Sequence, residues 1–61
     1  MTFYKLYDYE TNQDIYLNPN AIEYYVYNDT RVEIYLLSDG YILADKLDFM
    51  NMLFLEGGKE Y

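Results

Sequence analysis

The sequence contains neither cysteine nor histidine. Their absence excludes disulfide bonds, thiolate chemistry and the ligands that most zinc sites use. A chain of 61 residues buries only a small core, and domains of this size usually gain stability from a disulfide, a metal or a partner subunit. The remaining sources of stability are dense apolar packing or self-association. The hydrophobic content of 52% supports dense packing. We therefore expect one small acidic domain over residues 1–61, without metal or cofactor.

Basic residues are scarce: 4 Lys and Arg stand against 11 Asp and Glu, which gives a net charge of −7. Such a surface repels phosphates, so we expect no direct binding of nucleic acid. The same charge attracts basic protein surfaces. The N-terminus lacks the basic and apolar regions of a signal peptide, and no apolar run approaches the roughly 18 residues of a transmembrane helix. These features predict a soluble, cytoplasmic chain that contacts no membrane.

Catalytic and phosphate-binding motifs are missing as well. Carboxylate pairs such as Asp45 and Asp48 occur, but no His, Cys or clustered Lys accompanies them to form an acid–base or nucleophilic set. Asp45 fits better as a helix N-cap. Gly57 and Gly58 follow a helix rather than open one, so they do not form a phosphate-binding loop. The sequence predicts no enzyme and no catalytic residue.

What the chain does contain is a series of short, aromatic-rich segments with turn residues between them. Their alternation predicts strands over residues 2–9, 14–17, 21–27, 31–37 and 41–44, and a helix from about Lys46 to Leu55. Asn28-Asp29-Thr30 is a hairpin signal, and Gly40 can supply a positive φ in the next turn. The expected fold is α+β, mostly β: an antiparallel meander of four or five strands, flat or curled into a small barrel, with one C-terminal helix.

The outer face of the central hairpin, residues 21–37, is the first candidate for function. Val32, Ile34 and Leu36 are predicted to point inward. The opposite face and its turns would gather carboxylates and phenols: Glu23, Tyr25, Tyr27, Asp29, Glu33, Tyr35 and Asp39. Tyr is enriched in binding hot spots, and carboxylates along a strand can present charges at spacings comparable to phosphates. The alternative is an ordinary solvated sheet face, on which Tyr is simply a good strand former.

The C-terminal helix is the second candidate, because it is apolar on nearly all sides. Leu47, Met50 and Phe54 share one face, which we predict to lie on the sheet. The candidates for self-association are the remaining apolar side chains: Phe49, Met52, Leu53 and Leu55. The alternative is that the N-terminal strand curls over the helix and covers them.

A family resemblance rests on the run Ile15-Tyr16-Leu17-Asn18-Pro19-Asn20-Ala21-Ile22, then Val26, Val32-Glu33-Ile34-Tyr35-Leu36, Gly40 and Leu43. This pattern resembles the small flagellar FlbD-type proteins over roughly residues 14–50. The resemblance implies a Leu-Asn-Pro turn, two β-strands, a glycine turn and a short strand that leads to a helix. The chain departs from the family in its tyrosine content, its acidity and its extra N-terminal strand. The resemblance supports the fold and transfers no functional residue.

These features lead to three hypotheses. The first is a non-enzymatic, protein-binding inhibitor or regulator of the phage or mobile-element type. It would dock the acidic, Tyr-rich face on the basic, nucleic-acid-binding surface of a partner, as a DNA mimic in anti-defence; size and composition support this by analogy. The second is a structural or assembly module that forms a homodimer through the helix. The third is a FlbD-like accessory protein.

Overall fold

The structure of the protein is a computed structural model that describes residues 2–57. It contains five strands, a short 3-10 turn and one helix: β1 (Tyr4–Asp8), β2 (Gln13–Leu17), η1 (Pro19–Ala21), β3 (Ile22–Asn28), β4 (Arg31–Leu36), β5 (Tyr41–Asp45) and α1 (Lys46–Leu55). The predicted fold class, mostly β with one C-terminal helix, is confirmed.

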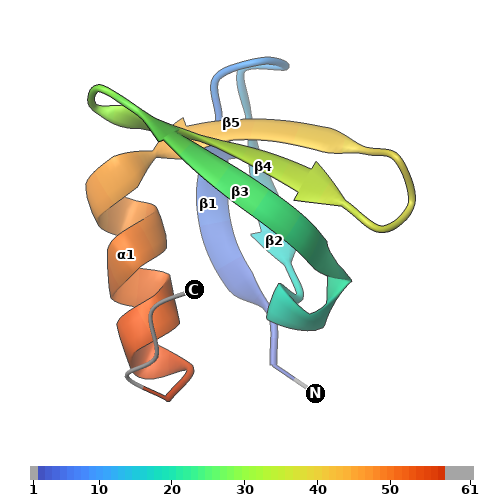
Figure 1. Cartoon of the computed structure of the whole chain (residues 1–61), viewed down its shortest axis with the longest axis vertical. Coiled ribbons are helices and arrows are strands. Elements are labelled where there is room, and N and C mark those ends of the chain that lie inside the picture. The colour runs from blue at the N-terminus through green and yellow to red at the C-terminus, as the bar shows by residue number, and fades with distance from the viewer. Residues whose placement is uncertain (1, 58–61) are drawn as a thin grey trace.

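The strands form two antiparallel sheets rather than one meander. β1 pairs with β2, and β3, β4 and β5 pair in chain order. The break falls at Asn18-Pro19, where η1 turns the chain and the Asn18 side chain accepts the Asn20 N–H at 3.0 Å. The two sheets are steeply inclined to each other, and α1 lies beside β1 below the three-stranded sheet (Figure 1). Within residues 2–57 the sheets do not close into a barrel.

Both ends of the helix follow from its flanking residues. The Asp45 carboxylate accepts the Asp48 N–H at 3.1 Å, so the predicted N-cap is confirmed. After Leu55 the chain reaches Gly57 at φ +149°, a backbone conformation that residues other than glycine rarely adopt. Gly58, the second predicted stop residue, lies outside the described residues.

The turn before β5 corrects the role expected for Gly40. The left-handed residue is Asp39, at φ +69°, and not Gly40. Asp tolerates this region better than most residues because its short side chain bonds locally. Glycine fits this position for a different reason, since a Cβ there would lie 3.0 Å from the end of the Leu36 side chain, which would have to move slightly.

The core lies between the two sheets and α1. Its buried members come from α1 and from every strand except β3: Leu6, Leu17, Val32, Ile34, Ile42, Ala44, Phe49, Met52 and Leu53. Ile22 and Tyr25 of β3 pack against this cluster while half-buried. The inward alternation predicted for β4 is confirmed, because Val32 and Ile34 are fully buried and Leu36 packs against the core.

β3 contains a bulge that the sequence did not reveal. Ile22 pairs with Leu36, but Tyr24 pairs with Tyr35, so two steps along β3 match one step along β4. Glu23 is the extra residue. Because side chains alternate with a period of two, one inserted residue exchanges the two faces for the rest of the strand. The outward face predicted for Tyr25 and Tyr27 is therefore wrong, and Tyr24 and Val26 point outward instead.

Asp8, at the end of β1, joins the two sheets. It is 3% exposed, the one buried polar or charged side chain among residues 2–57. One carboxylate oxygen accepts the N–H groups of Leu43 and Glu10 at 3.1 and 3.0 Å, and the other accepts the Thr11 hydroxyl at 2.9 Å. Beside it, the Tyr9 N–H donates to the Leu43 carbonyl at 2.7 Å. Burial opposes ionisation, yet these hydrogen bonds outweigh it and lower the pKa of Asp8.

We predict that Asp8→Ala lowers the free energy of unfolding by about 2–3 kcal/mol at neutral pH, because it leaves the Leu43 N–H without its acceptor. The stabilisation by the charged carboxylate is complete above the ordinary carboxyl pKa of about 4. It is lost as the pH falls through the lower pKa of the folded state. Urea unfolding followed by circular dichroism at pH 7 and pH 2.5 measures both effects.

The matched control is Asp14→Ala, whose exposed carboxylate makes a 3.7 Å surface ion pair with Lys5 and should change stability by less than about 0.5 kcal/mol. Equal effects of the two substitutions at pH 7 would contradict the role given to Asp8.

Candidate functional site

The bulge divides the predicted acidic and tyrosine-rich patch between two faces of the sheet. Tyr25 and Tyr27 lie on the side of the helix, where their ring centroids are 4.8 and 6.3 Å from that of Phe49. They are therefore not part of the outer face, and their inclusion in the patch is corrected. Glu33 and Tyr35 of β4 do lie on the outer face, as predicted, because β4 has no such shift.

Tyrosines from three strands form a row across the outer face. Tyr24 pairs with Tyr35 in β4, and Tyr35 pairs with Tyr41 in β5. The first two rings are stacked with centroids 4.6 Å apart, and the second and third are tilted at 5.2 Å. We call Tyr24, Tyr35 and Tyr41 the tyrosine row. Tyr24 is 52% exposed and Tyr41 37%, so the row presents aromatic surface to solvent.

Glu33 organises the polar groups beside the row. Its carboxylate accepts the Tyr35 hydroxyl at 3.0 Å and the Asn28 amide at 3.2 Å. The hydrogen bond to Glu33 is the main reason that the pKa of Tyr35 is raised. Burial raises the pKa of Tyr41, and the charges of Glu33, Glu10 and Asp8 raise it further. These two hydroxyls therefore stay protonated at neutral pH.

The other predicted members of the patch lie around its margins. Glu23 is the exposed bulge residue next to Tyr24. Asp29 and Asp39 lie in the two successive hairpin turns, at opposite ends of β4, and both have positive φ. Their turn geometry accounts for an Asp at each position. Sequence analysis missed Tyr24 and Tyr41, and only recognition of the bulge would have placed Tyr24 with Tyr35.

The basic side chains do not neutralise this face. The only ion pair among residues 2–57 joins Lys5 to Asp14 on the two-stranded sheet. The Arg31 guanidinium lies 3.4 Å from the centroid of the Tyr9 ring, and the Lys46 ammonium lies 5.2 Å from that of Tyr27. The Glu33 carboxylate on the outer face therefore forms no ion pair with a basic side chain in the described part of the chain.

The helix faces are opposite to those predicted. Phe49, Met52 and Leu53 are 0, 2 and 5% exposed, because they fill the core and β1 packs against the helix. Phe49 and Met52 are closed to a second molecule while the chain is folded, because α1 packs against β4 and β5 as well as β1. Coverage by the N-terminal strand, the alternative, accounts for part of this burial, and Leu53 is open only to the groove described below. Leu55, the fourth candidate, is exposed. It belongs to an outward apolar surface, the outer helix face: Leu47, Met50, Phe54 and Leu55.

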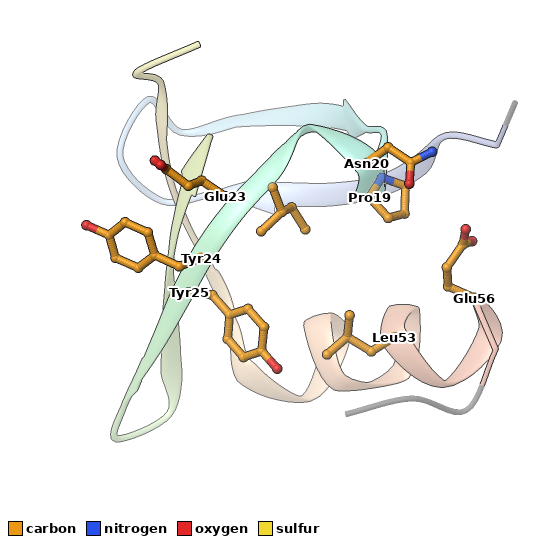
Figure 2. A pocket seen from close by; sticks show the side chains of 8 residues that line it. Pro19, Asn20, Glu23, Tyr24, Tyr25, Leu53 and Glu56 are labelled. Atoms are coloured by element: carbon orange, nitrogen blue, oxygen red, sulfur yellow. The ribbon is translucent and has the colours of Figure 1, made fainter. Parts of the chain in front are cut away.

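A groove of about 620 Å³ lies between the start of β3 and the end of α1. We call it the β3 groove. Leu53 and Glu56 line it from the helix side, while Glu23, Tyr24 and Tyr25 line it from the strand (Figure 2). Pro19, Asn20 and Ile22 complete the lining. Its residues include two carboxylates and no basic side chain.

The described residues contain neither a metal-binding cluster nor a membrane-spanning helix. Among residues 2–57, no group of three or more acidic, His or Cys side chains is arranged to hold a metal ion. None of the helices in that range is long and apolar enough to cross a membrane. The absence of enzymatic activity stays a prediction. Asp8, the one buried carboxylate among residues 2–57, has a structural explanation in its hydrogen bonds.

No protein-family model matches this chain, and no curated protein and no solved structure is significantly similar to it. The resemblance to FlbD-type proteins therefore stays a prediction. Three surfaces of the molecule are candidates for binding: the tyrosine row, the outer helix face and the β3 groove.

We predict opposite outcomes for two phenylalanines of the same helix. Phe49→Ala should lower the free energy of unfolding by about 3–5 kcal/mol, because it opens a cavity in the core. Phe54→Ala should change it by less than about 0.5 kcal/mol in dilute solution, since Phe54 is 71% exposed. Urea unfolding at one low protein concentration compares the pair. Similar losses for both variants would contradict the orientation of α1.

Proposed function

We propose that this protein is a non-enzymatic binding module that docks the outer face of its three-stranded sheet on a basic surface of another protein. The observation that supports this best is the tyrosine row, which presents exposed rings beside the unneutralised Glu33 carboxylate. Tyrosine provides contact area at low entropic cost together with a hydroxyl that can hydrogen-bond. A row held by ring stacking on three paired strands is also ordered before binding, which reduces the entropic cost of association.

Charge determines the kind of partner. A net charge of −7 on 61 residues repels acidic and phosphate-bearing surfaces and accelerates encounter with basic ones. Arg and Lys of a partner can pair with Glu33 and stack on the tyrosine rings. The specific form of this proposal is a DNA mimic of the phage or mobile-element type, whose target is the nucleic-acid-binding surface of a defence or regulatory protein. A cytoplasmic location remains part of the proposal.

The test is capture of partners from bacterial lysate by the tagged protein and two charge-reversal variants. Glu33→Lys reverses the charge beside the tyrosine row, and Asp14→Lys makes the same change on the exposed face of the other sheet. We expect a nucleic-acid-handling protein to be captured by the wild type and Asp14→Lys. Its recovery should fall at least about tenfold with Glu33→Lys and in high salt.

Added duplex DNA should release the captured protein, because it competes for the same basic surface. Identification by mass spectrometry with quantified recovery gives the readout. Equal recovery with the two variants would overturn the docking face. Recovery that depends on Glu33 but resists DNA would retain the docking face and reject the mimic.

A second candidate function is self-association through the outer helix face. Leu47, Phe54 and Leu55 are each more than 60% exposed, which is unusual for side chains of this size on a soluble surface. From Phe49 to Leu55 the helix has no charged residue, so two acidic chains could meet there without repulsion between like charges. The four side chains expose on the order of 500 Å², and two copies would bury about 1,000 Å², near the lower limit for a specific interface.

We predict that sedimentation equilibrium of the wild type shows a monomer–dimer equilibrium with a dissociation constant in the micromolar range, about 1–100 μM. Phe54→Asp should shift this constant upward by at least about tenfold, because it places a charge in the apolar contact. Asp48→Asn serves as the control on the same helix. A wild type that stays monomeric at millimolar concentration would rule out this function.

A further inference from the structure

The β3 groove runs along a strand edge. Four consecutive residues of β3, Ile22 to Tyr25, line it. Successive side chains of a strand point to opposite faces, so a groove that touches all four must follow the edge of the strand. β3 is an edge strand of the described sheet, because β4 is its one neighbour there. The backbone groups on its other edge lie outside the sheet ladder and can pair with an added strand.

The opposite wall provides an apolar base with negative charge at its rim. Leu53 comes from the core side of α1 and is 5% exposed, and Ile22 is half-buried beside it. Glu56 follows the last turn of the helix, where its carboxylate accepts the Tyr4 hydroxyl at 2.7 Å. Glu23 and Glu56 project on either side of the groove (Figure 2). Neither carboxylate belongs to an ion pair among residues 2–57.

We propose that the β3 groove binds a short, extended peptide segment that carries Lys or Arg. The peptide backbone pairs with the free edge of β3. Its basic side chains reach Glu23 and Glu56, and their methylene stems lie on Ile22, Tyr25 and Leu53. The volume of about 620 Å³ suits a few residues rather than a long strand. The bulge at Glu23 also limits pairing to a short stretch, because it interrupts the regular ladder.

This site differs from the proposed docking face. The groove follows the edge of β3, whereas the docking face is the outward surface of β3, β4 and β5, and only Glu23 and Tyr24 border both. The inference therefore does not rest on the proposed function. Each site can fail without the other, since Glu33 takes no part in the groove and Glu56 takes no part in the tyrosine row.

The test uses three synthetic peptides and nuclear magnetic resonance of the full chain. The probe is an acetylated, amidated pentapeptide Lys-Val-Arg-Val-Lys. Its proline version, Lys-Pro-Arg-Pro-Lys, has the same charge but lacks two backbone donors. Its acidic version, Glu-Val-Glu-Val-Glu, keeps the strand-forming residues and reverses the charge. We expect the probe to shift the amide signals of residues 22–25 and of Leu53 and Glu56. The proline and acidic versions should bind at least about tenfold more weakly.

Charge-neutral variants then identify the site. Glu56→Gln and Glu23→Gln should each weaken binding of the probe by about threefold to tenfold, because each removes one charge partner. Asp14→Asn, an equal change on the other sheet, should leave the affinity for the probe unchanged. Glu33→Lys should change that affinity by no more than about twofold. Well-dispersed amide spectra of the variants establish that they are folded.

Several results would overturn the inference. Binding by charge alone would appear as equal affinity for the proline version. Binding at the docking face would appear as shifts centred on residues 33–43 that Glu33→Lys abolishes. Affinities of Glu56→Gln and Glu23→Gln that match Asp14→Asn would exclude the groove, and shifts confined to Leu47, Phe54 and Leu55 would move the site to the outer helix face.

Discussion

The fold depends on the Asp8 carboxylate, because it connects two sheets that share no strand ladder. Its two oxygens satisfy the turn after β1 and the Leu43 N–H of β5 at the same time. The first sheet is thereby fixed against the edge of the second, and the Leu6 and Leu17 side chains are held over the inner face of β4 and β5. A chain with so small a core gains much from one satisfied polar contact of this kind, since a shift of either sheet would leave buried groups unpaired.

Local rules predicted most of the fold. The Asp45 cap, Gly57 and the period-two pattern of β4 each act within a few residues, so the bounds of α1 and the inward face of β4 could be read from the sequence. The faces that β3 and α1 turn toward the core could not be read from the sequence in this way. The bulge at Glu23 arises from pairing with β4, and residues 22–27 show a regular alternation that hides it. The helix is apolar on opposite sides, so the choice of the Phe54 face for the core was wrong, and only the shape of the core distinguishes Phe49 from Phe54.

The candidate site inherits these errors and their causes. Glu33 and Tyr35 were placed correctly because β4 is regular, while Tyr25 and Tyr27 were assigned to the wrong face because they follow the bulge. The β3 groove could not have been predicted at all, since one wall comes from η1 and β3 and the other from α1, which lies far from them in the sequence. The three surfaces share one property: each presents apolar or aromatic groups to a possible partner. This shared property supports the proposal that the protein is a binding module.

The bulge has a further consequence for how substitutions are tolerated along β3. Tyr24 and Tyr25 are identical neighbours, yet one stacks on Tyr35 at the surface and the other packs its edge on Phe49. Substitution of Tyr24 should therefore cost less stability than substitution of Tyr25, which packs on the core. Loss of one residue at position 23 would exchange these two environments along the rest of the strand. The fold should therefore tolerate a change of residue type at position 23 better than a deletion there.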